Sequence, residues 1–294
     1  MKLARKAFLM TSIVAAALPV SPALAHRQWL LPSATSVEGE APYVTFDAAV
    51  SEGLFDFDHL PIKLDGLSVT GPDGQPVAVE NPATGKRRST FDVKLAKPGT
   101  YRATLVSASI MASYMLNGEQ KRWRGTEADL AASLPAGATE VKTSRMESRL
   151  DAYVTAGQSG DALPVPTGKG LELLPLSSPT GYELGAPARF RALLDGKPVA
   201  DLDVTVVPGG GRFRADVKDM TVKTDAAGEV SIAWPLAGMM WVGASWPARQ
   251  EAPVAPPAGA APASAEASAT TPPAPRPMVP RRVNYAATLE VAPF

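Results

Sequence analysis

The chain contains two histidines, and each has neighbours that suit metal chemistry. His26 follows Ala23-Leu24-Ala25, a small-residue sequence typical of a signal-peptidase site. Cleavage after Ala25 would leave His26 as the first residue, with a free α-amine and an imidazole on the same residue. Both groups lose their protons near neutral pH, so together they can chelate an ion of copper, nickel, cobalt or zinc. The alternative is that histidine occurs at the cleavage point by chance.

The second histidine lies in the segment Gly53-Leu-Phe-Asp-Phe-Asp-His-Leu-Pro61 and follows two carboxylates. Asp56 and Asp58 could bind an ion or orient an imidazole through hydrogen bonds. In a strand, alternation would place His59 on the face opposite the aspartates, as an ordinary partly buried residue. In a loop, these side chains can converge. The sequence therefore predicts metal ligands at His26, His59, Asp56 and Asp58, with the strand interpretation left open.

The composition excludes several other functions. The chain has 294 residues with 29 basic and 29 acidic side chains, so its charge gives no sign of a nucleic-acid partner. It has no cysteine, which excludes disulfides and thiolate sites. It also has no phosphate-binding loop, no dinucleotide-binding glycine motif and no serine in a nucleophile-elbow setting. We therefore expect no catalytic residues and no enzyme activity.

The first 25 residues have the pattern of an export signal. Lys2, Arg5 and Lys6 precede an apolar stretch, Ala7 to Val20, which is too short to span a bilayer comfortably. We predict a signal peptide over residues 1–25 that is cleaved after Ala25. The mature protein is then expected in the periplasm, with no direct membrane span.

The rest of the chain predicts an all-β fold of two immunoglobulin-like antiparallel β-sandwich domains, with one short helix in the first. Short β-prone runs alternate with turns every 8–12 residues, as is typical of sandwiches. Lys97-Pro98-Gly99 is expected to return the chain from a strand at 89–95 to one at 100–107. A helix is expected at 126–134, with Thr126 as its cap. Four further turns are expected to close hairpins: Gly71–Gly74, Asn117-Gly118, Asp195–Pro198 and Asp225–Gly228.

Composition also suggests where the domains divide. The first sandwich is expected over residues 26–156 and the second over 171–294, joined by a Gly/Pro/Ser-rich linker at 157–170. Residues 252–280 are mostly proline and alanine and cannot build a core, so they are expected to form a disordered loop between the last two strands. This loop is either a tether for a partner or a tolerated expansion.

Several of these segments together resemble a NikM-like family of periplasmic proteins of unassigned function, which is associated with nickel and cobalt uptake. The similar segments are Ala25-His-Arg-Gln-Trp-Leu30, Leu54–Pro61, Asn117–Gly125, Phe190–Val207 and Thr224–Val230. The resemblance implies a metal-linked periplasmic role in which His26 and His59 are the matching positions. The chain lacks the transmembrane segment of the transporter-linked members.

The prediction is therefore an exported metal-binding protein that acts as an accessory or delivery component of nickel, cobalt, copper or iron uptake or homeostasis. Its partners would be a divalent transition metal ion (Ni, Co or Cu) and a membrane transporter or outer-membrane receptor component. One alternative is a copper-dependent oxidative enzyme that uses an N-terminal histidine chelate. Another is a structural adhesion or interaction module with no metal.

Overall fold

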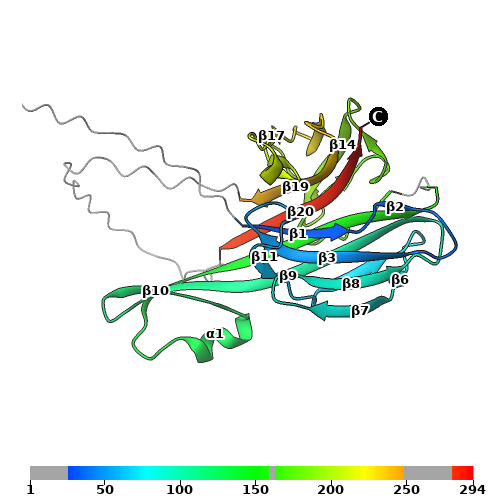
Figure 1. Cartoon of the computed structure of the whole chain (residues 1–294). Coiled ribbons are helices and arrows are strands. Elements are labelled where there is room, and N and C mark those ends of the chain that lie inside the picture. The colour runs from blue at the N-terminus through cyan, green and yellow to red at the C-terminus, as the bar shows by residue number, and fades with distance from the viewer. Residues whose placement is uncertain (1–25, 159–162, 248–279, 294) are drawn as a thin grey trace, which may run out of the picture.

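The structure is a computed structural model that describes residues 26–158, 163–247 and 280–293. The predicted signal peptide and nearly all of the proline- and alanine-rich tract lie outside these residues. The described chain consists of strands in three sheets and, within this part, a single α-helix (Figure 1). The prediction of an all-β fold is confirmed, and the described chain forms β-sandwiches whose strand pairs are mostly antiparallel.

The first sandwich pairs a small sheet with half of a large one. The small sheet has the order β1-β3-β8-β7, with β4 paired to β3. Its core side chains meet those of β5, β9 and β11 across the sandwich, and Phe46 and Phe91 stack on the small sheet with ring centroids 4.9 Å apart. The small sheet's strands are β1 (Arg27–Pro32), β3 (Tyr43–Ser51), β4 (Leu60–Pro61), β7 (Val79–Thr84) and β8 (Ser89–Lys94).

The second sandwich has the same construction. A four-stranded sheet of β12, β14, β15 and β18 packs on the other half of the large sheet. Tyr182, Phe190 and Trp234 form an aromatic cluster in its core. The small sheet's strands are β12 (Leu171–Pro175), β14 (Ala188–Leu194), β15 (Lys197–Pro198) and β18 (Glu229–Ile232).

The large sheet has eleven strands and runs through both sandwiches. Its main order is β17-β16-β19-β20-β11-β9-β5-β6, and β2, β10 and β13 pair at its margins. These strands are β2 (Ser36–Val37), β5 (Leu67–Thr70), β6 (Pro76–Val77), β9 (Gly99–Leu116), β10 (Glu119–Gly125), β11 (Thr139–Ala156), β13 (Tyr182–Glu183), β16 (Asp203–Pro208), β17 (Met220–Lys223), β19 (Gly238–Trp246) and β20 (Arg281–Ala292).

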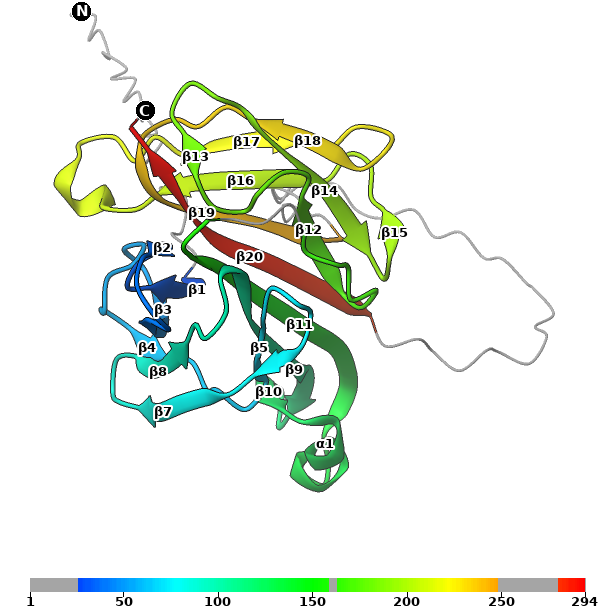
Figure 2. The same cartoon turned by 90° about the vertical axis from the view of Figure 1, so that its right-hand side faces the viewer.

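The two halves of this sheet meet where β20 pairs in parallel with β11 (Figure 2). The two small sheets cover opposite faces of the large sheet. On β20, Ala286 belongs to the first core, whereas its neighbours Tyr285 and Ala287 belong to the second. Because successive side chains of a strand point to opposite faces, one strand can serve both cores. The face of β9 and β11 that points away from the first core is therefore turned towards the second sandwich.

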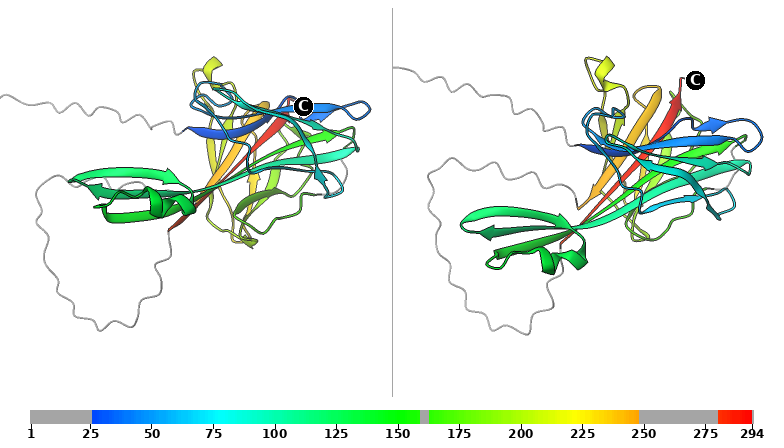
Figure 3. Two further views of the ribbon diagram at one scale, coloured as in Figure 1. Left: turned by 90° about the horizontal axis from the view of Figure 1, so that it is seen from below. Right: turned by 60° about the horizontal axis from the view of Figure 1, so that its bottom comes forward.

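The long strands β9 and β11 project beyond the body as an arm that also carries β10 and the helix α1 (Glu127–Ser133) (Figure 3). Asn117 and Gly118 both have positive φ, as the tight β9–β10 turn requires. The Thr126 hydroxyl caps α1 by accepting from the Asp129 backbone N–H at 3.3 Å. These two sequence predictions are confirmed. In the residues that the structure describes, no helix is long and apolar enough to cross a membrane.

Two of the predicted hairpins are wrong. Residues 97–99 do not fold β8 back on β9, because β8 pairs with β3 and β7 whereas β9 pairs with β5, β10 and β11. Residues 225–228 form a turn, but they connect β17 in the large sheet to β18 in the small one. Both turns carry the chain from one sheet of a sandwich to the other, and local sequence does not distinguish such a crossing from a hairpin.

Candidate metal-binding site

The pairing of β1 with β3 fixes the position of the first histidine. Arg27 lies opposite Ser51 in this antiparallel pair, so His26 lies next to Glu52. The His26 Nε2 atom is 3.2 Å from a carboxylate oxygen of Glu52, and both side chains are well exposed. Sequence reasoning did not single out Glu52. Glu52 lies one residue beyond the end of β3, and nothing else in the sequence points to it. This position indicates a contact with His26 only once the register of β3 with β1 is known.

The second histidine lies in the loop between β3 and β4, so the strand interpretation is wrong for residues 53–59, and only Leu60 and Pro61 of this segment pair as a strand. The loop brings the His59 ring onto the His26 ring. Their centroids are 4.0 Å apart and their planes differ by 21°. The only two imidazoles of the chain, 33 positions apart in sequence, therefore stack on each other at the surface.

The two predicted carboxylate ligands have other partners. Asp58 accepts hydrogen bonds from the backbone N–H groups of Glu52 and Gly53, at 3.1 and 2.9 Å. Asp56 forms an ion pair with Arg212 of the second sandwich, at 3.1 Å. Both aspartates thus hold the loop in place, and Glu52 is the carboxylate that contacts an imidazole.

A small apolar cluster lies beneath the loop. Phe55 packs edge-on against the buried Trp29, with ring centroids 5.5 Å apart, and their cluster includes Val207 of the second sandwich. Phe55 has a φ of 64°, a conformation that is costly for a bulky residue and persists only where the surroundings enforce it. Gly209 provides the space, since a Cβ atom there would lie 2.7 Å from the Phe55 ring.

Two arginines fix the other side of the loop. Arg87 donates to the backbone carbonyls of Asp58 and His59. The Arg88 guanidinium lies over the half-exposed Phe57 ring, 4.3 Å from its centroid. The backbone at His59 is therefore held by hydrogen bonds from two sides, which limits the positions that its ring can take.

This arrangement offers two imidazole nitrogens to one ion, with a third donor from the α-amine that cleavage would expose. Metal–nitrogen bonds of about 2.0–2.1 Å can join donors up to about 4 Å apart. Stacked rings direct their lone pairs side by side, so one ring must rotate before both can bind the same ion. Across the described ranges, no three His, Cys, Asp or Glu side chains already form a metal-binding group. The His26 side chain is 42% exposed, so it can make this rotation by giving up its contact with Glu52.

Comparison with known proteins places these features in a family. The sequence profile described as a domain of unknown function (DUF4198) matches residues 23–248. No curated protein matches the chain. Similar solved structures include the D0-D1 domain of intimin, with 14% identity over 73% of this chain and 88% of the other, and a TM-score of 0.19. The D00-D0 domain of intimin has 10% identity, coverage of 74% and 91%, and a TM-score of 0.19.

Proposed function

This chain belongs to the DUF4198 family, a domain of unknown function, so its function has to be argued from its own residues. We propose that the exported, mature protein binds a divalent transition metal ion through His26 and His59. The ligands are the α-amine and ring of His26 and the ring of His59. Glu52 is placed to neutralise the ion or to complete its coordination. Copper, nickel and cobalt are the expected ions, because they favour nitrogen donors.

The observation that carries this proposal is the stacking of the two imidazoles at 4.0 Å. Either histidine alone would be unremarkable on a protein surface. Their meeting depends on the β1–β3 register and on a loop that is held by Asp58, Arg87 and a residue in a costly backbone conformation. The loop also joins the two sandwiches through Phe55 and Asp56, so it is the ring pair, and not the loop alone, that supports a metal site.

The biological role that we propose is delivery or accessory binding in transition-metal uptake or homeostasis in the periplasm. A small surface site with three nitrogen donors suits an ion that must be passed on, because a partner's ligands can reach it. The partner would be a membrane transporter or an outer-membrane receptor component. The metal identity and this role rest on the site and on the resemblance to NikM-like proteins.

Calorimetric titration of the mature chain, beginning at His26, with Cu(II), Ni(II) and Co(II) tests the proposal. We expect a dissociation constant below about 10 μM for at least one ion. His26→Ala and His59→Ala should each weaken binding at least tenfold. Binding should also weaken below about pH 6, because protons compete with the ion for imidazole nitrogens.

The matched control keeps both rings and blocks only the amine. A chain with one protease-removable segment before His26 should bind as weakly as His26→Ala, and removal of that segment should restore binding. Wild-type binding weaker than about 10 μM for all three ions, or unchanged binding in both alanine variants, would overturn the proposal.

A further inference from the structure

A large cleft lies on the face of β9 and β11 that points away from the first core. It has a volume of about 1410 Å³ and is bounded on the far side by residues 163–171, which lead into the second sandwich. Strand register places Arg102, Thr104 and Val106 of β9 in a row on its floor, beside Arg149 and Tyr153 of β11. Ligand sites commonly occur in such clefts between packed units.

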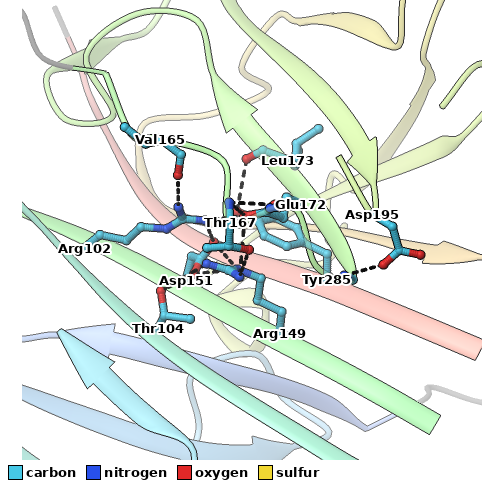
Figure 4. A network of polar contacts seen from close by, with 12 residues as sticks. Arg102, Thr104, Arg149, Asp151, Val165, Thr167, Glu172, Leu173, Asp195 and Tyr285 are labelled. Carbon is cyan, nitrogen blue, oxygen red and sulfur yellow. Dashed lines mark hydrogen bonds and ion pairs between the residues drawn. The ribbon is translucent and has the colours of Figure 1, made fainter. Parts of the chain in front are cut away.

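Buried charges form the base of this cleft (Figure 4). The Asp151 carboxylate is fully buried and accepts from Arg102 at 2.7 Å, from Thr104 at 2.7 Å and from Arg149 at 3.1 Å. Burial alone would raise the pKa of Asp151, but the adjacent arginine charges and these hydrogen bonds hold it below its usual range. Asp151 is therefore ionised and keeps both guanidinium groups in fixed positions.

Arg102 retains donor capacity that its neighbours do not use. A guanidinium carries five N–H donors. The Arg102 group donates to Asp151, to Glu172 and, in a long 3.3 Å bond, to the Val165 carbonyl. Its Nη1 carries two hydrogens and makes only the 3.3 Å bond to Val165, whereas its Nε, which has no acceptor among the described residues, is buried away from the cleft. Unused donors on a buried cation are costly, so this position suits a ligand with acceptor oxygens.

Apolar side chains border the same cationic position. Val165, whose carbonyl accepts from Arg102, is 78% exposed, and Leu163 in the same segment is 45% exposed. Val106 on the floor is 47% exposed, although it lies within a long strand. Three of the chain's exposed large apolar residues thus line one cleft, next to a guanidinium.

Lys169 provides a cation at the rim of the cleft, where it is exposed. Five arginine or lysine side chains line the cleft, against three acidic ones, and the carboxylates of Asp151 and Glu172 lie beneath. The four arginines pair with these acidic groups, whereas Lys169 forms no ion pair among the described residues. The charge of Lys169 therefore favours an anion over a neutral or cationic molecule of the same shape.

We propose that this cleft binds a small amphipathic organic anion. Its carboxylate or sulfonate oxygens accept from Arg102, and its apolar body lies against Val106, Leu163 and Val165. The site is separate from the histidine pair and does not depend on the metal proposal.

The test uses the fluorescent probe 8-anilino-1-naphthalenesulfonate with the mature, folded chain. We expect saturable binding, at least tenfold tighter than that of N-phenyl-1-naphthylamine, which has a similar aromatic body but no sulfonate. Val106→Asp should weaken binding of the sulfonate probe at least fivefold, and so should Lys169→Glu. Neither residue takes part in the buried network, so both variants should fold.

Two matched variants control for charge and exposure. Val141→Asp changes a valine that is 42% exposed on β11 outside the cleft, and Lys86→Glu reverses an exposed lysine in the β7–β8 turn. Both should bind the probe as the wild type does. Non-saturable binding, equal affinity for the neutral probe, or equal losses in the control variants would overturn the proposal.

Discussion

The side chain of Asp58 determines where the His59 ring can lie. It accepts from two consecutive backbone N–H groups at the end of β3 and so closes the loop on itself. The carboxylate performs the role that a capping residue performs at a helix end. Its contribution to metal binding is therefore expected to be indirect, through the position of the loop.

Replacement of this carboxylate separates positioning from coordination. Asp58→Ala removes two hydrogen bonds from exposed backbone groups, so the free energy of unfolding should fall by about 1–2 kcal/mol. Metal affinity should fall several-fold, because the His59 ring is no longer held near His26. Urea unfolding and calorimetric titration measure the two effects.

Asp58→Asn separates the two roles in part. Its amide oxygen can accept from one of the two backbone N–H groups but its NH2 group faces the other, so the free energy of unfolding and the metal affinity should both lie between those of the wild type and of the Ala variant. An Asn variant that is more stable than the Ala variant but binds metal equally poorly would show that Asp58 is itself a ligand. Asp65→Ala, which changes another exposed aspartate, should leave both measurements unchanged.

At this scale, the sequence allowed part of the site to be predicted. His26 and His59 stood out because the chain has two histidines and because one follows a predicted cleavage site. The partner roles were not predictable. Whether Asp56, Asp58 or Glu52 meets an imidazole depends on the β1–β3 register and on the left-handed backbone at Phe55, and neither leaves a mark on local composition.

The loop after β16 supports the loop that carries His59. Gly209, in the second sandwich, lies against the Phe55 ring. It therefore limits the position of Phe55, which lies four residues before His59 in the first sandwich. This contact, together with the ion pair between Asp56 and Arg212, links the site to both sandwiches. The site geometry therefore depends on elements that are about 150 positions apart in the chain.

Gly209→Ala tests this support. The added Cβ would lie 2.7 Å from the Phe55 ring and 3.1 Å from the Met239 carbonyl oxygen, so the loop must shift. We expect a loss of about 1–3 kcal/mol in the free energy of unfolding, as is usual for overpacking. Metal affinity should fall as well. Thermal unfolding and titration of the mature chain provide the measurements.

The same loop contains its own control. A Cβ at Gly211 meets no atom within 4 Å, so Gly211→Ala should change neither stability nor affinity. If the two alanine variants behave alike, close packing against Phe55 is not what positions the loop.

Elements with a plain alternating pattern were predicted well. The strand at Ala188–Leu194 and the turn at Asn117-Gly118 are examples. The longest missed strand is β11, although its second half alternates, with apolar Leu150 and Ala152 at even positions and charged Arg149 and Asp151 at odd ones. The sequence therefore contained the strand signal. It did not show that the charged face is covered, so that Arg149 and Asp151 are buried.

At the scale of the whole molecule, the large sheet determines how the two sandwiches depend on each other. The predicted linker, residues 157–170, fills the interval between the end of β11 and the start of β12. However, β20, which follows the linker by more than 100 residues, pairs with β11 over eight residue pairs. A chain that ended at the linker would leave β11 without this neighbour. The sequence indicated strands on both sides of the linker, but the pairing between the two halves has no local signal.

The buried network beside this junction provides a test of how the molecule holds together. Asp151 lies on β11, next to β20, and together with the buried Glu172 it neutralises Arg102 and Arg149 beneath the cleft. Asp151→Asn leaves these two guanidinium groups with Glu172 as their remaining buried counter-charge, so we expect a loss of about 3–5 kcal/mol in the free energy of unfolding. Circular dichroism and tryptophan fluorescence should follow one shared transition during urea unfolding, because the network contacts both halves.

Asp203→Asn is the control variant, because it breaks an exposed ion pair with Lys223. It should lower the free energy of unfolding by less than about 1 kcal/mol.

Acid unfolding gives the same network a second readout. The pKa of Asp151 is lower in the folded chain than in the unfolded one, because burial, which would raise it, is outweighed by the charges of Arg102 and Arg149. The unfolded state therefore takes up the proton first, and the stabilisation is complete above the unfolded pKa of about 3.9 and is lost as the pH falls below it. The free energy of unfolding of the wild type should fall more steeply below about pH 4 than that of Asp151→Asn, measured by urea titration at a series of pH values. Parallel acid limbs in the two proteins would mean that the Asp151 carboxyl is not held ionised by these arginines.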